Sequence, residues 1–158
     1  MRTTGGLLGT CGFDERNKTY RCLWNNNKIL LIDKVGGPYN GKLDLPGGTI
    51  EFYENPEETL IRELYEEIGI NVTKYELVDV NSINLEWKHK GETEKIKHIF
   101  ILYKIIEFNG NIKEKNIIDD INDDSKGAKF YDIRTLDKSR LSDIALKALE
   151  RILWVIIS

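Results

Sequence analysis

The chain has 158 residues, 41% of them hydrophobic and 31% charged, which is the composition of a globular domain with a core of its own. The formal net charge is -3 and the lysines are scattered, so we expect no nucleic acid polymer as a partner. Two cysteines are too few for a disulfide framework, and we expect a reducing, cytoplasmic environment.

The first third of the chain predicts short strands joined by turns. Residues 20–24 and 28–33 are rich in β-forming side chains. The three asparagines between them tolerate a positive φ, so the pair is predicted to form a hairpin. Residues 42–45 form an extended piece before a proline. Gly47 and Gly48 then allow a tight bend or a close approach of the backbone to a ligand.

A helix is predicted over residues 56–68. Asn55 is a good N-cap, Pro56 suits the first helical position, and Glu58 stands three residues after the cap. Gly69 is a natural end for the helix.

The second half of the chain predicts longer strands and a second helix. We expect strands at residues 75–80, 83–88, 96–107 and 128–132, with a turn at Gly91. The strand at 96–107 is continuously apolar in its later part, which predicts a central strand buried on both faces. Apolar residues at near-helical spacing predict an amphipathic helix over residues 142–154.

Strands with two separated helices predict one α/β domain over residues 1–158, built as a sandwich around a mixed sheet. The first residues lack the apolar region of a signal peptide, and the apolar tail at 152–157 is too short to cross a bilayer. We therefore expect no membrane partner. We interpret the tail as part of the core or as the contact of a homodimer.

The helix at 56–68 carries an excess of negative charge on one side. On a wheel of about 100° per residue, Glu63, Glu66 and Glu67 fall within about 100° of arc. Each like-charge pair costs roughly 0.2–0.5 kcal/mol. For this helix segment alone a solvated face is the usual explanation, and only the residues around it favour a metal site. Oxygen ligands on one side suit Mg²⁺ or Mn²⁺, and Mg²⁺ sites usually include substrate phosphate oxygens. The neighbouring face is apolar and consists of Leu60, Ile61, Leu64 and Ile68.

The spacing around this helix resembles the signature of the Nudix hydrolase (MutT-like) family. Gly48 is followed after five residues by Glu54, and after seven more by the run RELYEEIGI, which ends at Ile70. Every defined position of G-x5-E-x7-R-E-U-x-E-E-x-G-U, with U aliphatic, is matched over residues 48–70. The preceding Leu-Pro-Gly is the usual lead-in, and the rest of the chain fits the family more loosely.

The resemblance implies an α/β/α sandwich with a mixed β-sheet between the helices. It also implies Mg²⁺-dependent hydrolysis of a diphosphate bond in a nucleoside diphosphate linked to another moiety, with Mn²⁺ as a substitute metal. Position by position, it gives metal-binding roles to the carbonyl of Gly47 and to Glu63, Glu66 and Glu67. Glu54 matches a position with a supporting or occasional ligand role.

The same match gives Arg62 the role of an arginine that orients the acids, and its spacing allows contacts with Glu58 and Glu66. In the implied mechanism a carboxylate takes the proton of the water that attacks phosphorus. Glu63 is one candidate. The other is an acidic loop that contains Asp119, Asp120, Asp123 and Asp124. Within that loop Asp123 or Asp124 is our choice, and a solvated acidic turn is the alternative interpretation.

The sequence predicts substrate-binding residues less clearly than metal-binding ones. Tyr39 and Trp87 are expected near the cleft, where either could stack on a nucleobase. His98 is interpreted as a residue on the sheet surface, with a position facing a substrate cleft as the alternative. The markers of family members that act on NADH, dinucleoside polyphosphates, coenzyme A and ADP-ribose are absent, which leaves nucleoside triphosphates, nucleotide sugars and other small diphosphates.

Two other functions are compatible with the fold that the resemblance implies. One is a catalytically inactive, nucleotide-sensing domain, but such domains usually lose acids of the signature or carry a DNA-binding extension. The other is isomerisation of an isoprenoid diphosphate, which requires a cysteine in the cleft. Cys11 and Cys22 both precede the signature, in a different context.

Overall fold

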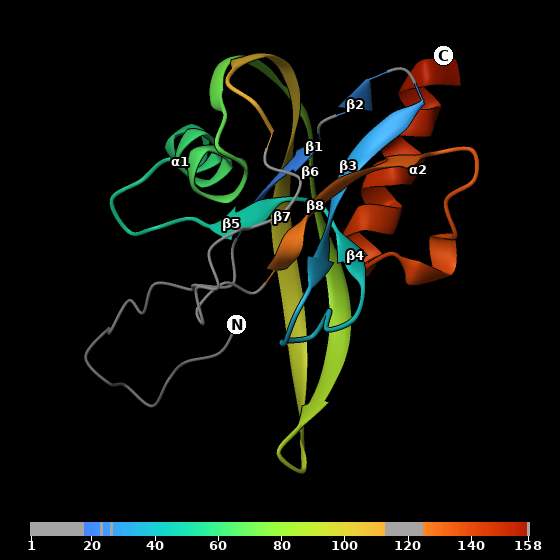
Figure 1. The fold of residues 1–158 in the computed structure, drawn as a ribbon. Coiled ribbons are helices and arrows are strands. Elements are labelled where there is room, and N and C mark those ends of the chain that lie inside the picture. The colour runs from blue at the N-terminus through green and yellow to red at the C-terminus, as the bar shows by residue number, and fades with distance from the viewer. Residues whose placement is uncertain (1–17, 23, 26, 113–124, 158) are drawn as a thin grey trace.

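The computed structural model describes residues 18–22, 24–25, 27–112 and 125–157. Two four-stranded sheets lie between two helices, α1 (Pro56–Ile68) and α2 (Asp143–Ile157), which occupy opposite sides of the strands (Figure 1). The prediction of an α/β/α sandwich is confirmed. The strands, however, are divided between two sheets instead of forming the single mixed sheet that the sequence suggested.

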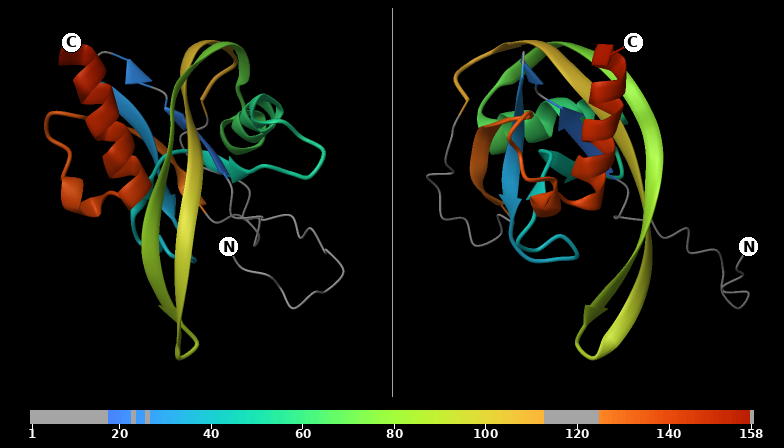
Figure 2. Two further views of the ribbon diagram at one scale, coloured as in Figure 1. Left: turned by 180° about the vertical axis from the view of Figure 1, so that it is seen from behind. Right: turned by 90° about the vertical axis from the view of Figure 1, so that its right-hand side faces the viewer.

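The first sheet is mixed. Its strand order is β5 (Gly47–Thr49), β1 (Lys18–Cys22), β7 (Glu92–Asn109) and β6 (Asn71–His89). Strand β1 runs antiparallel to β5 and parallel to β7, and β6 pairs antiparallel with β7. The β6–β7 hairpin is long and curved, and its turn projects beyond the body of the molecule (Figures 1 and 2).

One strand prediction in this sheet was wrong. The expected separate strands at 75–80 and 83–88 are one continuous strand, β6. Asn81 and Ser82, which favour turns, pair with Phe100 and Ile99 instead. The neighbouring strand β7 offers an unbroken ladder, and β6 follows it with bulges between Val72 and Tyr75 and between Leu77 and Asp79.

The second sheet contains the strands β2 (Trp24–Asn25), β3 (Lys28–Lys34), β4 (Leu43–Asp44) and β8 (Ser125–Asp132). The predicted hairpin is confirmed in part, because β2 pairs antiparallel with the start of β3. Residues 20–22 belong to the other sheet. The predicted last strand is confirmed as β8, which pairs with β3.

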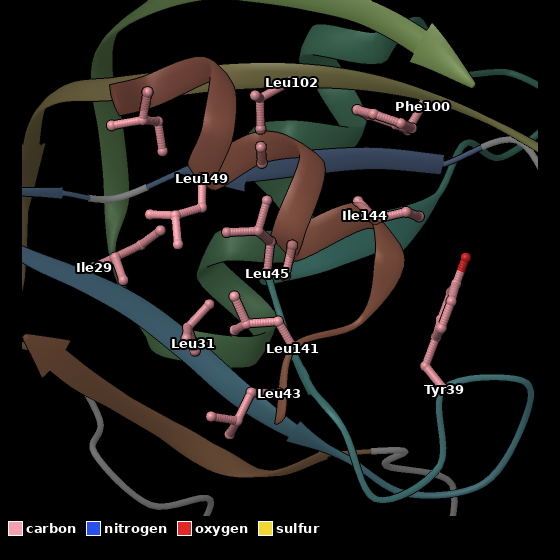
Figure 3. Close-up of a cluster of buried hydrophobic side chains, with 13 residues drawn as sticks. Ile29, Leu31, Tyr39, Leu43, Leu45, Phe100, Leu102, Leu141, Ile144 and Leu149 are labelled. Atoms are coloured by element: carbon pink, nitrogen blue, oxygen red, sulfur yellow. The ribbon is translucent and has the colours of Figure 1, made fainter. Parts of the chain in front are cut away.

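The core has two halves, and β3 separates them. Ile29 and Leu31 point toward the cluster under α2, whereas Leu30 and Ile32 point toward the cluster under α1. The cluster under α2 is the larger of the two, and Figure 3 shows its side chains. The strand buried on both faces is therefore β3, whereas the expected one, at 96–107, leaves Ile99 44% and Ile106 39% exposed.

Helix α2 closes one side of the sandwich after a short 3-10 helix, η1 (Lys138–Arg140). The hydroxyl of Ser142 accepts a hydrogen bond of 3.0 Å from the backbone N–H of Ala145, which caps the helix start. The predicted helix at 142–154 is confirmed and continues to Ile157. Ile152 of the apolar tail lies in the core, whereas Trp154 is 63% exposed. In the part of the chain that the structure describes, neither helix is long and apolar enough to cross a membrane.

Candidate active site

Helix α1 is fixed at both ends by local interactions. The side chain of Asn55 accepts a hydrogen bond of 2.9 Å from the backbone N–H of Glu58, whose carboxylate accepts one of 3.0 Å from the N–H of Asn55. Gly69 ends the helix with a φ of 80°, in the left-handed region. The prediction of a helix over Pro56–Ile68 is confirmed at both ends. The charged residues of α1 therefore stand on a rigid element.

The helix packs through a narrow apolar stripe. Leu60, Leu64 and Ile68 follow each other at intervals of four residues, and all three are 0% exposed. Ile61 was expected on the same face but is 39% exposed, because it points about 100° away from Leu60. The rest of the helix circumference is left for polar side chains.

Arg62 is the centre of the charged face. Its Nε binds a carboxylate oxygen of Glu54, and its Nη2 donates to the other oxygen at 3.0 Å. Its Nη1 donates to Glu63 at 2.9 Å and to Glu66 at 3.1 Å. The sequence spacing also allowed a contact with Glu58, but that side chain is used in the helix cap. One guanidinium therefore holds three carboxylates from the loop and the helix.

Arg62 and Glu54 shift each other's pKa in the direction that favours their charged forms. Hydrogen bonds from Arg62, followed by one of 2.6 Å from the hydroxyl of Thr59, lower the pKa of Glu54 to about 2. The side chain of Glu54 is 16% exposed, so solvent does not replace these partners easily. The same contacts raise the pKa of Arg62 above its ordinary value. At neutral pH the loop before α1 is therefore held to the helix by full charges.

The carboxylate of Glu63 lies directly against the backbone of β5. A Cβ atom added at Gly48 would be 2.2 Å from Cδ and 2.6 Å from Oε1 of Glu63. Real Cβ atoms do not approach other atoms so closely, so a side chain at this position would displace the carboxylate of Glu63. The structure thus brings Glu63 together with β5, the strand that contains Gly47 and Gly48, which were expected beside the metal.

The donor set fits a hard divalent cation by its chemistry, since it offers carboxylate oxygens and a backbone carbonyl. As they stand, the described residues contain no group of three or more His, Cys, Asp or Glu close enough together to hold a metal ion. Arg62 binds both Glu63 and Glu66. Glu67 lies partly buried on the same helix. The metal-binding roles of Gly47, Glu63, Glu66 and Glu67 stay a prediction.

A second polar site lies inside the molecule, toward α2. The hydroxyl of Tyr39 is hydrogen-bonded to Nδ1 of His98 at 3.1 Å, and the two rings lie parallel with centroids 5.8 Å apart. Both residues are 6% exposed, and they line a cavity of about 120 Å³ together with the loop that begins at Lys34. Burial, followed by the charges of Asp44 and Asp143, raises the pKa of Tyr39.

This arrangement changes the roles expected for both residues. The ring of Tyr39 is packed in the cluster under α2, where it is not available for stacking on a base (Figure 3). His98 was interpreted as a sheet-surface residue, yet it is buried beside a cavity. The alternation along β7, in which Ile96, Phe100 and Leu102 are also buried, was the signal that could have placed it inside.

The other candidates lie elsewhere. Trp87 pairs with Glu94 near the turn of the β6–β7 hairpin and stacks on His89, with ring centroids 3.8 Å apart. That turn points away from α1 (Figure 1), so the structure does not bring Trp87 to the charged face. Asp119, Asp120, Asp123 and Asp124 lie outside the described residues.

The comparison with protein families shows the family to which the chain belongs. The model of the NUDIX domain matches residues 16–151. The chain belongs to the NUDIX-domain family. An ADP-ribose pyrophosphatase of Methanocaldococcus jannaschii is 35% identical over 113 residues, which are 72% of this chain and 59% of that protein. An 8-oxo-dGTP diphosphatase of Escherichia coli K12 is 38% identical over 83 residues, 52% of this chain and 57% of that protein. The chain thus spans less than two thirds of the length of these NUDIX relatives.

Solved structures agree with the fold. A MutT NUDIX hydrolase from Burkholderia pseudomallei superposes with a TM-score of 0.69 at 23% sequence identity, and the match covers 87% of this chain and 97% of that one. Together with the family match, this identifies the two sheets and two helices as the NUDIX fold. Arg62 and its three hydrogen-bonded carboxylates, Glu54, Glu63 and Glu66, all occupy defined positions of the sequence signature.

Proposed function

We propose that the chain is a NUDIX hydrolase that cleaves a diphosphate bond in a small nucleotide-like substrate, with Mg²⁺ as cofactor and Mn²⁺ as a substitute. The observation that carries this proposal is the placement of the Glu63 carboxylate against the Gly48 backbone, beside acids held by Arg62. The relatives whose names are ADP-ribose pyrophosphatase and 8-oxo-dGTP diphosphatase support a substrate of this class.

The residues that would hold the metal are Glu63, Glu66 and Glu67 with the carbonyl of Gly47, and Glu54 in a supporting role. When bound there, Mg²⁺ supplies positive charge that stabilises the negative charge developing on the phosphate oxygens.

Each residue of the chain then has a distinct task. Arg62 positions Glu63 and Glu66 through its hydrogen bonds to both carboxylates. Glu63 is the candidate within the described residues for accepting the proton of the attacking water, because its carboxylate faces the β5 backbone. Tyr39 and His98 offer hydrogen-bonding groups to a polar edge of the substrate from their cavity.

For the substrate we propose a nucleoside triphosphate, a deoxynucleoside triphosphate or a nucleotide sugar. The proline that marks ADP-ribose members is absent, since the chain has no proline after Pro56. The match to an ADP-ribose pyrophosphatase nevertheless keeps nucleotide sugars in this group. A homodimer and a cytoplasmic location stay predictions from the sequence.

The test is hydrolysis of a panel of nucleotides in the presence and absence of Mg²⁺. We expect Glu63→Gln and Glu67→Gln to lower kcat/KM by about 100-fold or more, because each removes a carboxylate that would hold the metal ion. Glu150→Gln, which changes an exposed carboxylate on α2, is the matched control and should keep wild-type activity. Near wild-type rates in both α1 variants would contradict the assignment of Glu63 and Glu67 to the active site. Tight nucleotide binding without turnover in the wild-type protein would instead favour the sensing domain.

A further inference from the structure

Thr59 is a polar residue that is completely buried near the start of α1. It is 0% exposed, and its hydroxyl donates a hydrogen bond of 2.6 Å to a carboxylate oxygen of Glu54. A second acceptor, the carbonyl of Asn55, lies farther away at 3.3 Å. The shorter distance and the charge of the carboxylate assign the hydroxyl proton to Glu54. Thr59 therefore uses its hydroxyl to hold the loop before the helix.

The start of α1 is capped without this hydroxyl. Asn55 and Glu58 bind each other's backbone N–H groups through their side chains. Threonine is also a weaker helix former than alanine, because its branched side chain is stiff at χ1. The contact that distinguishes threonine at this position from an apolar residue of similar size is the hydrogen bond to Glu54.

Thr59 gives Glu54 a short and rigid attachment to the helix, which Arg62 cannot give. Arg62 binds both oxygens of Glu54, but its guanidinium stands at the end of a long side chain with several rotatable bonds. The hydroxyl of Thr59 is bonded to Cβ, so the χ1 angle alone places its oxygen relative to the helix backbone. Thr59 therefore limits the movement of the Arg62–Glu54 pair relative to α1.

The hydroxyl lies on the side of α1 that carries the acids of the site. Residues spaced by three or four positions share about 100° of the helix circumference, and these are Thr59, Arg62, Glu63 and Glu66. The Nη1 atom of Arg62 donates to Glu63 at 2.9 Å and to Glu66 at 3.1 Å. A displacement of Glu54 would move the guanidinium that it shares with these two acids, and both hydrogen bonds would change with it.

We propose that Thr59 is a positioning residue of the proposed active site. Its hydroxyl fixes Glu54 relative to α1, and Glu54 in turn fixes the guanidinium of Arg62 beside Glu63. Thr59 contacts neither substrate nor metal and acts through Glu54. Its part in the reaction rests on the proposed function, in which Glu63 and Glu66 hold the metal ion. Thr59 is not one of the defined positions of the signature, so the contact belongs to this chain's own sequence.

The first experiment measures the binding of Mn²⁺ alone to the substrate-free protein by electron paramagnetic resonance. We expect Thr59→Val and Thr59→Ala to raise the dissociation constant about tenfold, the low end of the range for residues that orient metal ligands. Valine puts a methyl group where the oxygen of Glu54 lies only 2.6 Å away, so the carboxylate must move, whereas alanine only removes the hydroxyl. Thr59→Ser keeps the hydroxyl and should bind Mn²⁺ as the wild-type protein does.

The second experiment measures hydrolysis of the best nucleotide of the panel with Mg²⁺. In Thr59→Val, kcat should fall about tenfold and KM should stay at the wild-type value, because the substrate does not contact Thr59. The double variant Thr59→Val/Glu54→Gln should lose no more than Glu54→Gln alone, because the effect passes through Glu54. The matched control is Ser139→Ala, which removes a hydroxyl that donates to Asp137 at 2.7 Å beside η1. It should keep wild-type kcat and Mn²⁺ affinity.

Unchanged Mn²⁺ affinity and kcat in Thr59→Val and Thr59→Ala would overturn the proposal, and a loss of stability alone would give Thr59 a purely structural role. An additional loss in the double variant would also overturn it, since Thr59 would then act by a route other than Glu54. The wild-type protein tests the proposed function separately. Mn²⁺ binding that depends on Thr59 without any turnover would contradict only the hydrolase, whereas turnover that is independent of Thr59 would contradict only the positioning role. No Mn²⁺ binding by the wild-type protein would contradict both.

Discussion

Helices α1 and α2 both cover one side of the strands with an apolar face, but they use their charged residues differently. On α1, Arg62 gathers Glu54, Glu63 and Glu66. On α2, Lys147 donates a 2.8 Å hydrogen bond to the carbonyl of Ser82 on β6, and Arg151 lies over the ring of Trp154. The charges of α2 therefore attach the helix to its surroundings, whereas those of α1 concentrate negative groups at one place. Glu63 and Glu66 repel each other as like charges on one helix face, and their shared partner Arg62 offsets this repulsion.

The apolar faces differ in the opposite sense. Helix α1 buries the stripe formed by Leu60, Leu64 and Ile68. Helix α2 contributes more side chains to the larger cluster, and it does so together with residues of both sheets (Figure 3). The residues that α2 buries there are Ile144, Ala145, Ala148, Leu149 and Ile152. Substitutions under α2 should therefore affect stability, and substitutions around Arg62 should affect activity.

The largest expected effect is on stability, from Leu149→Ala in α2. Leu149 is 1% exposed, so its truncation leaves a cavity and should lower the free energy of unfolding by about 2–5 kcal/mol. Urea denaturation measures this change, and kcat/KM per folded molecule should stay at the wild-type value. Ile61→Ala on α1, at a position 39% exposed, is the control and should cost less than about 1 kcal/mol. A large loss of kcat/KM in folded Leu149→Ala would contradict the division of roles between the helices.

The next effect is on activity, from Gly48→Ala. The added Cβ would meet Glu63 at 2.2 Å and displace its carboxylate from the β5 backbone. We expect kcat/KM to fall by about 100-fold, which corresponds to about 2.7 kcal/mol in the activation barrier. Circular dichroism and urea denaturation would show that the variant is still folded.

Gly91→Ala is the matched control for this substitution. Gly91 lies at the turn of the β6–β7 hairpin, with open space around the position of a Cβ but a φ of 75°. Its replacement should therefore lower stability by about 1 kcal/mol through backbone strain and leave kcat/KM unchanged. If Gly48→Ala instead behaves like Gly91→Ala, the contact between Glu63 and β5 has no part in the reaction.

The features that could be predicted from the sequence depend on local interactions. The ends of α1 follow from Asn55, Pro56 and Gly69, each of which acts within one turn of the helix. The acids of the site could be named because their spacing in the sequence is fixed by a matched signature. Their partners across the β5–α1 loop were only partly foreseen, since the contact of Arg62 with Glu54 joins residues eight positions apart.

The features that were missed depend on residues distant in the sequence. Asn81 and Ser82 favour a turn between the two strands expected on either side, and they are extended because β7 pairs with them. The burial of His98 requires Tyr39, which lies 59 positions earlier in the chain. The division of the strands between two sheets likewise depends on distant pairing. Strand β1 pairs with β5 and β7, and not with β3, its expected hairpin partner. Periodicity within a segment contains none of this information.

The smallest expected effect is the contribution of Glu54 to the pH dependence of stability. It tests whether the charges around α1 act on activity as well as on stability. Its pKa is about 2 in the folded protein, because of Arg62, against an ordinary value of 4.5. The unfolded chain therefore takes up a proton first as the pH falls, and the stabilisation by ionised Glu54 is present above about pH 4.5 and lost toward pH 2. Glu54→Gln should be less stable than wild type at pH 7, and urea denaturation should show the difference narrowing through this window.

Asp132 provides the matched acid away from α1. Hydrogen bonds from Arg134 also lower its pKa to about 2, so Asp132→Asn should show the same narrowing. The two variants should differ in activity at pH 7. Glu54→Gln loosens the loop that Arg62 holds beside Glu63 and should lower kcat/KM, whereas Asp132→Asn should not, because its pair has no contact with the α1 acids. Equal kcat/KM in both variants would contradict this prediction. It would mean that the Arg62–Glu54 pair only stabilises the fold, and that Glu63 and Glu66 keep their positions without the loop.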